Sequence, residues 1–277
     1  KNTKLVVFTG LGDIKSAFDS ENLRRAAGAA SRELNGNKSA TFSLPHKSVV
    51  ELAAIAEGAA LGAYSFTEFL GSSKQDQKEP LSQVSVISKF ADTAQAKAAA
   101  KRAEIIAEQT YLVRDLINTP PSHLTPDSFS QQLKKLSSKY GVKAEILNDA
   151  ALKKGGYGGI IGVGQGSANP PRLFNISYTP KGVKAKKKYA YVGKGITFDT
   201  GGLALKPALG MEAMKSDMSG AAAVCAATIA LALLKVPVAI EAWAPLAENM
   251  VSDHATRPSD IITIYGGKTV EVINPDA

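Results

Sequence analysis

Residues 188–207 read KYAYVGKGITFDTGGLALKP, which joins a strand-like segment to a glycine-rich loop. Residues 188–193 have the aromatic and apolar character of a short strand, and Lys194, Asp199 and Lys206 follow among glycines. Glycine adopts backbone conformations that strain other residues, and charged side chains at a strand end stay solvated unless they bind something. The stretch is therefore either a loose surface loop or a functional site.

The sequence on both sides of this stretch alternates between strand and helix patterns. An alanine-rich helix is predicted over 219–234. The predicted strands are 142–147, 158–164, 172–178, 188–193 and 238–246. This alternation is typical of an α/β domain with a mainly parallel sheet, in which ligands bind beyond the carboxyl ends of the strands.

Residues 1–92 have the pattern of a smaller α/β domain. Its helices are predicted from apolar residues at helical spacing and its strands from short apolar runs. The predicted elements are strands 4–8 and 83–88 and helices 20–34 and 47–64.

A long segment, 93–118, is rich in Ala, Lys, Glu and Arg and predicts a helix that ends before Pro120. The next helix is expected to begin with Thr125 as N-cap and Pro126 as its first residue, and to end before Gly141. The predicted organisation is an N-terminal domain, a linker helix and a C-terminal domain over 1–92, 93–118 and 119–277.

Composition indicates a globular protein. The 277 residues are 44% hydrophobic and 21% charged, and this length is typical of about two domains. Cys225 is the only cysteine, which excludes an internal disulfide and suits a reducing compartment. Apolar stretches of membrane-spanning length are interrupted by charges or turn signals, and the N-terminal residues lack the apolar core of a signal peptide. We therefore expect a cytoplasmic protein that does not bind membranes.

The net charge of +8 is partly concentrated in one run of lysines. The run consists of Lys181, Lys184, Lys186, Lys187 and Lys188. Between two strand-like segments, such a run is typical of a solvated loop, and binding to nucleic acid is the alternative.

Three aspartates are candidates for a metal site. Asp199 follows the strand at 188–193, Asp217 precedes the alanine-rich helix, and Asp276 follows the strand-like KTVEVI. If these segments belong to one parallel sheet, the carboxylates converge at its edge, where such hard oxygen ligands suit divalent cations. The alternative is that Asp199 caps a turn and Asp217 stabilises a helix dipole.

The two lysines of the glycine-rich loop fit this alternative less well. Beside carboxylates, Lys194 or Lys206 can serve as a neutral metal ligand or as a fixed cation near developing oxyanion charge. The G-x-S-x-G elbow, the H-E-x-x-H zinc motif and the Walker loop are absent from the sequence, so other common hydrolase and nucleotide sites are not indicated.

Five segments, in the same order along the chain, resemble those of the leucyl aminopeptidase family of dinuclear-metal exopeptidases. They are RDLINTPPSHLTP, VGKGITFDTGGLALKP, MKSDMSGAAAV, APLAENM and INPDA. The resemblance covers nearly the whole chain and implies a macro-like N-terminal domain, a linker helix and an α/β catalytic domain. It also implies a cytosolic homo-hexamer that uses two divalent ions, manganese or zinc with magnesium as an alternative, to remove N-terminal residues such as leucine from peptides.

The resemblance assigns roles to individual residues. Lys194 and Asp199 correspond to metal ligands, and Asp199 to the one that bridges both ions. Lys206 corresponds to the group that polarises the scissile carbonyl and stabilises the tetrahedral intermediate. The remaining matches are Asp217 and Asp276 as metal ligands, Asp217 for the more loosely held ion, and Met214 as a lining residue of the side-chain pocket.

The chain also departs from the family pattern. The family continues past Ala277 with a bridging glutamate and an arginine that holds a bicarbonate base. We therefore expect this chain to be a fragment of a longer enzyme and to be inactive by itself. Pro275 and Ser219 replace the usual threonine and glycine. A nucleic-acid-binding or regulatory protein and a catalytically silent scaffold are the alternative functions.

Overall fold

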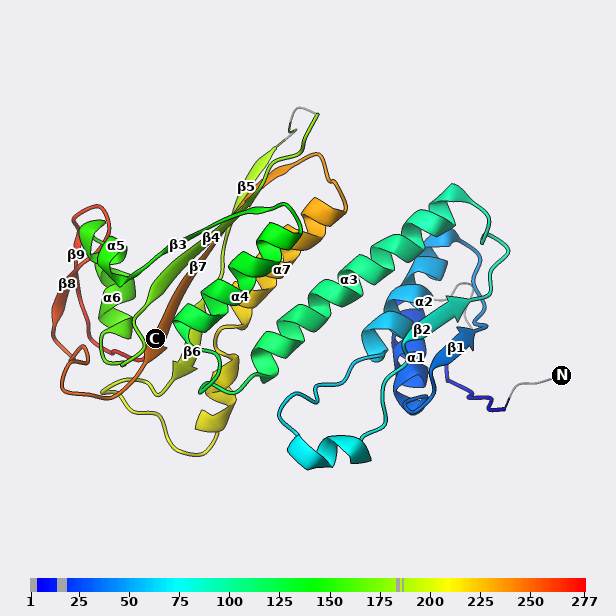
Figure 1. The fold of residues 1–277 in the computed structure, drawn as a ribbon, viewed down its shortest axis with the longest axis horizontal. Coiled ribbons are helices and arrows are strands. Elements are labelled where there is room, and N and C mark those ends of the chain that lie inside the picture. Colours follow the sequence, from blue (N-terminus) through cyan, green and yellow to red (C-terminus); the bar gives the residue numbers. More distant parts are fainter. Residues whose placement is uncertain (1–3, 14–18, 183–184, 186) are drawn as a thin grey trace. The chain divides into compact units, whose positions relative to one another are not determined.

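The computed structural model describes residues 4–13, 19–182, 185 and 187–277 (Figure 1). The chain divides into two compact units, Lys1–Tyr111 and Leu112–Ala277. Each unit has its own hydrophobic core.

The first unit combines helices with a small parallel sheet. The elements are α1 (Ser20–Glu33), β1 (Ser39–Phe42), α2 (Val49–Gly62), the 3-10 helix η1 (Gly71–Asp76), β2 (Gln83–Val86) and the first part of α3 (Ala94–Asn118). β1 and β2 pair in parallel, with Phe42 opposite Val86. The core forms where α1 and α2 pack against each other and against β1, and includes Leu23, Phe42 and Ile55.

The helices of this unit were predicted from sequence, but one strand was not correctly placed. The prediction of a strand at 4–8 is wrong, because these residues pair with no strand in the described part of the chain, and Phe8 is 94% exposed. An apolar run becomes a strand only where a partner strand accepts its hydrogen bonds, and local sequence does not reveal that partner. The short strand β1, which the pattern did not indicate, pairs with β2 instead.

Helix α3 confirms the helix predicted over 93–118. Its residues up to Tyr111 belong to the first unit and those from Leu112 to the second. The hydroxyl of Tyr111 donates a hydrogen bond to the carbonyl oxygen of Ala63 at 2.7 Å, within the first unit.

The second unit consists of a five-stranded sheet, helices and a separate hairpin. Its helices are α4 (Pro126–Lys139), α5 (Asp149–Lys154), α6 (Gly158–Gly164), the 3-10 helix η2 (Met211–Ser216) and α7 (Ser219–Leu233). Its strands are β3 (Lys143–Leu147), β4 (Arg172–Tyr178), β5 (Lys188–Val192), β6 (Gly195–Asp199), β7 (Ala239–Asn249), β8 (Ile261–Thr263) and β9 (Thr269–Glu271).

The long strand β7 organises this sheet. β4 pairs antiparallel with one edge of β7, and β3 pairs antiparallel with β4. On the other edge, β5 and then β6 pair with β7 in parallel. Strands β3, β5, β6 and β7 therefore share one direction and β4 opposes them. The sheet is mainly parallel in strand direction, as expected, although both pairings of β4 are antiparallel.

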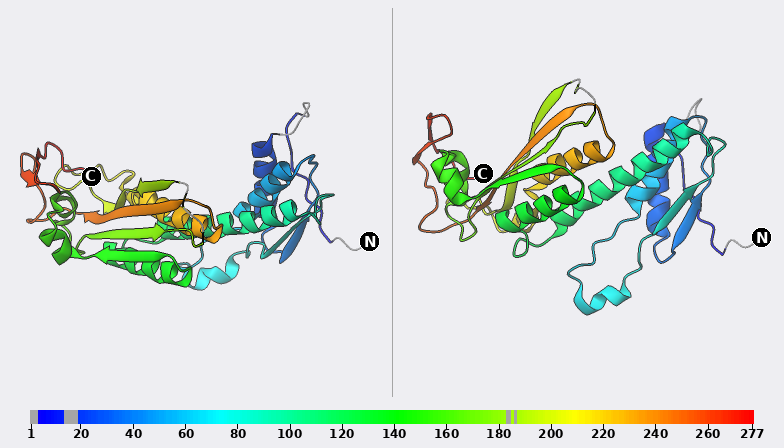
Figure 2. Two further views of the ribbon diagram at one scale, coloured as in Figure 1. Left: turned by 90° about the horizontal axis from the view of Figure 1, so that it is seen from above. Right: turned by 45° about the horizontal axis from the view of Figure 1, so that its top comes forward.

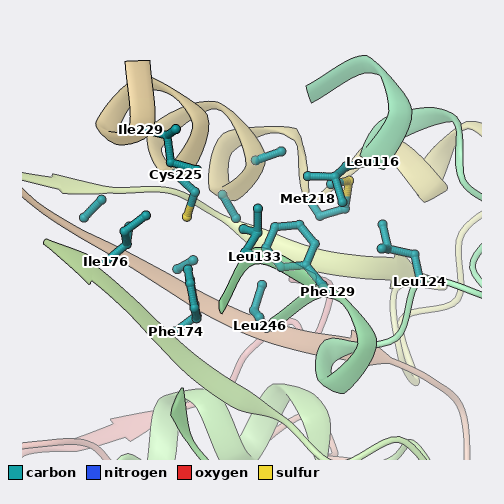
Figure 3. Packing of buried hydrophobic residues seen from close by; sticks show 14 of the residues in the cluster. Leu116, Leu124, Phe129, Leu133, Phe174, Ile176, Met218, Cys225, Ile229 and Leu246 are labelled. Carbon is teal, nitrogen blue, oxygen red and sulfur yellow. The ribbon is translucent and has the colours of Figure 1, made fainter. Parts of the chain in front are cut away.

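Helices α4 and α7 cover one face of the sheet (Figure 2). Phe129 and Leu133 of α4, and Cys225 and Ile229 of α7, pack with Phe174 of β4 in a fully buried cluster (Figure 3). Alternate residues of a strand point to opposite faces, so the residues 242, 244 and 246 of β7 face the same core. Burial of this apolar face anchors β7 and fixes where its carboxyl end lies.

The capping signals of α4 act as predicted. The Thr125 side chain accepts a hydrogen bond from the Ser128 amide, Pro126 is the first helical residue, and Gly141 has a φ of +67° past the end. These three features begin and end the helix at the expected positions.

One further prediction for this unit is wrong, and one condition set for the metal site is not met. Residues 158–164, predicted as a strand, form helix α6, because their short apolar run fits either element. The segment KTVEVI does not join the main sheet, since β9 pairs antiparallel with β8 in a separate hairpin. Asp276 therefore does not follow a strand of the main sheet.

Among the described residues, one helical stretch, Met211–Leu233, has the length and apolar composition that a membrane span requires. The core helix of a globular domain has the same properties, and in α7 Ala221, Ala222, Cys225 and Ile229 are fully buried in the core. The stretch is thus weak evidence for a membrane segment.

Candidate metal and catalytic site

Asp199 is the last residue of β6 and lies opposite Asn249, the last residue of β7. Its side chain is 1% exposed. Oδ1 accepts hydrogen bonds from the Gly201 amide at 2.9 Å and from Asn249 Nδ2 at 2.9 Å. A buried carboxylate needs such donors, and here they leave Oδ2 for another partner.

A tight turn follows Asp199 and brings Lys206 back to it. Gly201 and Gly202 have φ angles of +86° and +61°, a left-handed backbone that glycine adopts without strain. The Lys206 amide donates to the Thr200 carbonyl at 2.9 Å and closes the turn. The glycines identified in the sequence thus position a lysine next to a carboxylate.

Lys206 bridges two carboxylates. Its Nζ lies 3.3 Å from Asp199 Oδ2 and donates a hydrogen bond to Asp276 Oδ1. The hydrogen bond with Asp276 raises the pKa of Lys206 against the opposing effect of desolvation, and Asp199 raises it further. The same hydrogen bond lowers the pKa of Asp276. Both shifts favour the charged forms of Lys206 and Asp276 at neutral pH.

Lys194 forms a second ion pair, with Asp217. Lys194 precedes β6, and its Nζ lies 3.1 Å from Asp217 Oδ2. Asp217 follows η2 and precedes α7. Burial raises the pKa of the Asp217 carboxyl, and Lys194 partly opposes this effect. Although Asp217 Oδ2 is within ion-pair distance of Lys194, this buried oxygen accepts no hydrogen bond of adequate geometry.

The segment 274–277 reaches this site after the β8–β9 hairpin. Pro275 O accepts a hydrogen bond from Asn249 Nδ2 at 3.1 Å, and Ala277 O accepts one from Lys194 Nζ. The Asp276 amide donates to Asn274 Oδ1 at 3.0 Å. Asp276 is thus close to Lys206 without belonging to the main sheet.

The predicted site residues fall into two neighbouring groups, Asp199–Lys206–Asp276 and Lys194–Asp217. Among the residues that the structure describes, no three Asp, Glu, His or Cys side chains are close enough to form a metal-binding group. The three carboxylates are instead interleaved with lysine ammonium groups. The carboxylate oxygens, including Asp217 Oδ2, which accepts no hydrogen bond of adequate geometry, are hard ligands of the kind that divalent cations bind, so the donor set fits such ions.

Met214 lies in η2, three residues before Asp217, and is half-buried. An apolar hollow of about 420 Å³ borders Lys194 and is also lined by Ile160, Val163, Ile196 and Pro245. Met214 is not among its lining residues. Its role as a lining residue of a side-chain pocket stays a prediction.

The lysine run lies away from these contacts. Lys181, Lys187 and Lys188 are exposed, and Lys188 Nζ lies 3.6 Å from Glu241 Oε2. Lys184 and Lys186 lie outside the described residues. Lys181 and Lys187 are exposed outside the strands, as predicted for a solvated loop, whereas Lys188 is the first residue of β5.

Asn249 is a site residue that sequence reasoning missed. It ends the long apolar strand β7, and its buried amide contacts both Asp199 and Pro275. The available signal was a polar residue at the carboxyl end of a buried strand, where functional side chains gather in α/β sheets.

Two family models match the chain. The model described as the cytosol aminopeptidase family, catalytic domain, matches residues 111–277. The model of the N-terminal domain of the same family matches residues 1–73. All six predicted site residues lie within the match to the catalytic domain.

Curated relatives and a solved structure agree with these matches. A "Probable cytosol aminopeptidase" from Streptomyces avermitilis is 50% identical over 99% of this chain and 55% of its own length. One from Rhodococcus erythropolis is 47% identical over 98% of this chain and 53% of its own length. The structure described as "Bottromycin maturation enzyme BotP in complex with Mn" superposes with a TM-score of 0.85 at 35% identity, over 96% of this chain and 56% of that one. The chain thus spans about half the length of these relatives.

Proposed function

Because the chain belongs to the cytosol aminopeptidase family, we propose that the protein is a metal-dependent aminopeptidase that releases N-terminal residues from peptides. The observation that carries the proposal is the position of Lys206, with its ammonium group between the carboxylates of Asp199 and Asp276. This cluster lies in the part of the chain that the catalytic-domain model matches.

Four residues are proposed to hold two divalent ions. Asp199, Asp217 and Asp276 offer carboxylate oxygens, and Lys194 offers an amine that must be neutral to bind a metal. Support comes from Asp217 Oδ2, a buried oxygen that pairs with Lys194 Nζ at 3.1 Å without a hydrogen bond of adequate geometry, and from Asp199 Oδ2, which pairs with the Lys206 ammonium. Divalent ions held there supply Lewis-acid stabilisation of a carbonyl oxygen and lower the pKa of a water molecule.

Lys206 is proposed to stabilise charge on the substrate. Its two carboxylate partners keep it protonated, so it retains a fixed positive charge at the edge of the site. A cation at this position stabilises the oxyanion that develops when water adds to a peptide carbonyl. Because the glycine turn holds Lys206 in place, little reorganisation is needed during the reaction.

Membership of the family also suggests the substrate, the metal, the compartment and the assembly. We propose leucine and other apolar N-terminal residues as substrates, with Met214 lining the side-chain pocket. The ions are proposed to be manganese or zinc, with magnesium as an alternative, since carboxylate-rich sites accept several divalent metals. The cytoplasm and a homo-hexamer are proposed as the compartment and assembly, and light scattering of the intact protein tests the latter.

Hydrolysis of a leucine anilide by the intact protein tests the activity. After dialysis against a chelator, we expect turnover to be lost, and addition of Mn²⁺ or Zn²⁺ is expected to restore it. Alanine anilide and glutamate anilide measured in parallel test the preference for apolar residues. Turnover that is equal with and without chelator contradicts the proposed metal dependence.

A further inference from the structure

We propose that Asn249 is a positioning residue that orients the Asp199 carboxylate, with Oδ1 held by hydrogen bonds and Oδ2 presented to the cation site. The inference rests on the proposed metal site and adds to it a residue that does not itself bind the ion. Asn249 is 4% exposed, so its amide has no access to bulk water.

The contacts of Asn249 support this role. Its Nδ2 donates to Asp199 Oδ1 at 2.9 Å and to Pro275 O at 3.1 Å. An amide nitrogen has two hydrogens, so these bonds use its full donor capacity. One side chain therefore links the aspartate that ends β6 to the segment that carries Asp276.

The backbone of Asn249 also holds the loop that follows Asp199. Its carbonyl oxygen accepts hydrogen bonds from the Thr200 amide at 3.0 Å and from Thr200 Oγ1 at 2.9 Å. Thr200 Oγ1 in turn accepts from the Gly202 amide at 3.2 Å. Thr200 is thus bound directly to the end of β7, and Gly202 is bound to it through Thr200. The end of β7 is itself fixed, because this strand packs in the core.

The pattern of bonds at Asp199 is asymmetric. Oδ1 has two neutral donors, Asn249 Nδ2 and the Gly201 amide, whereas Oδ2 lies 3.3 Å from the Lys206 ammonium. Without Asn249, the carboxylate loses one of the bonds that fix its rotation, and its Oδ1 becomes partly unsatisfied in a buried position. A carboxylate that can rotate binds a cation less tightly, because ordering it then costs conformational entropy.

Asn249→Ala tests this inference, with Asn175→Ala as the matched control. Asn175 is a buried asparagine of the neighbouring strand β4, and its Nδ2 donates to the Ala242 carbonyl at 3.2 Å instead of to a carboxylate. Both variants lose a buried amide from the same sheet, so their effects on thermal stability are expected to be similar. If Asn249→Ala does not fold, Asn249→Ser keeps a polar group in the position and serves as the second variant.

The readouts are Mn²⁺ affinity by calorimetry and the visible absorption spectrum of the Co²⁺-loaded protein. We expect Asn249→Ala to weaken Mn²⁺ binding by about 10- to 100-fold and to change the Co²⁺ spectrum, while Asn175→Ala stays within about twofold of wild type. Equal Mn²⁺ affinity and equal spectra in wild type and Asn249→Ala overturn the inference and leave the proposed function intact. Failure of the wild-type protein to bind Mn²⁺, Zn²⁺ or Co²⁺ overturns the proposed function and the inference with it.

Discussion

Lys206 Nζ lies 3.3 Å from Asp199 Oδ2. Asp199 ends β6, so the loop that follows this strand folds back and places its lysine beside the aspartate that precedes it. The return depends on the left-handed turn at Gly201 and Gly202 and on the bond from the Lys206 amide to the Thr200 carbonyl. A cation fixed in this way suits stabilisation of developing negative charge better than a mobile surface lysine does.

Replacement of Lys206 by alanine is therefore expected to lower kcat by about 100-fold or more while the metal content stays nearly unchanged. Turnover of leucine anilide and elemental analysis of the purified protein measure the two quantities. Lys181→Ala, which removes an exposed lysine of the same chain, is the control and is expected to leave both unchanged. Loss of metal together with activity in Lys206→Ala indicates instead that Lys206 is the ligand and Lys194 the fixed cation.

Asp199→Ala is expected to abolish both metal binding and hydrolysis, because the proposed bridging carboxylate serves both ions. Calorimetric titration with Mn²⁺ and the anilide assay test the two effects separately. Asp253→Ala removes a carboxylate whose side chain is 87% exposed and controls for the loss of charge alone. A variant at position 199 with wild-type metal content and turnover contradicts the assignment of the site.

The parts of the site that were predictable from sequence are those encoded by short local patterns. The glycine-rich segment after the strand predicted at 188–193 indicated Asp199 and Lys206, although the pattern did not show that residues 195–199 form the strand β6. Thr125 with Pro126 marked the beginning of α4. Each of these signals involves residues only a few positions apart, whose geometry is set by turn and capping preferences.

The parts that could not be predicted depend on long-range pairing. Asp276 approaches Lys206 through a hairpin outside the main sheet, and Asn249 contacts Asp199 across 50 residues of sequence. The apolar run at 4–8 looked like a strand, but it pairs with no strand among the residues that the structure describes. Spacing and composition contain no direct information about which distant segment satisfies a given hydrogen-bonding group.

Adjacent glycines at the start of α6 provide a test of the packing between this helix and the β8–β9 hairpin. A Cβ added at Gly158 would lie 1.9 Å from the Thr263 carbonyl oxygen, whereas one at Gly159 would meet only the Ile264 Cγ2 atom at 3.7 Å. We expect Gly158→Ala to destabilise the fold by about 1–3 kcal/mol, as overpacking does, and Gly159→Ala to be neutral or slightly stabilising. Urea unfolding of the two variants measures the difference, and equal midpoints would show that the hairpin moves away from the helix without cost.

Burial of the only cysteine predicts a particular dependence of stability on pH. Cys225 lies in α7 among the apolar side chains that cover β4 and β7 (Figure 3), and desolvation raises its thiol pKa from 9.0 to about 12. Below pH 9 the thiol is neutral in both the folded and the unfolded states. Between pH 9 and 12 the unfolded thiol loses its proton while the folded one keeps it, so the free energy of unfolding falls by about 1.4 kcal/mol per pH unit from this group.

Comparison of wild type with Cys225→Ala isolates that contribution, because other groups titrate equally in both proteins. Cavity formation in the variant gives an offset that does not depend on pH, so the stability advantage of wild type is expected to be constant from pH 7 to 8.5 and to shrink above pH 9. Denaturant unfolding at pH 7 to 10.5 measures the two curves, and a disulfide reagent added to the folded wild type is expected to react only as fast as the protein opens. If the two free energies of unfolding differ by the same amount at every pH, or if the reagent rapidly labels the folded protein, the thiol is accessible to water. In that case α7 does not exclude water from this face of the sheet.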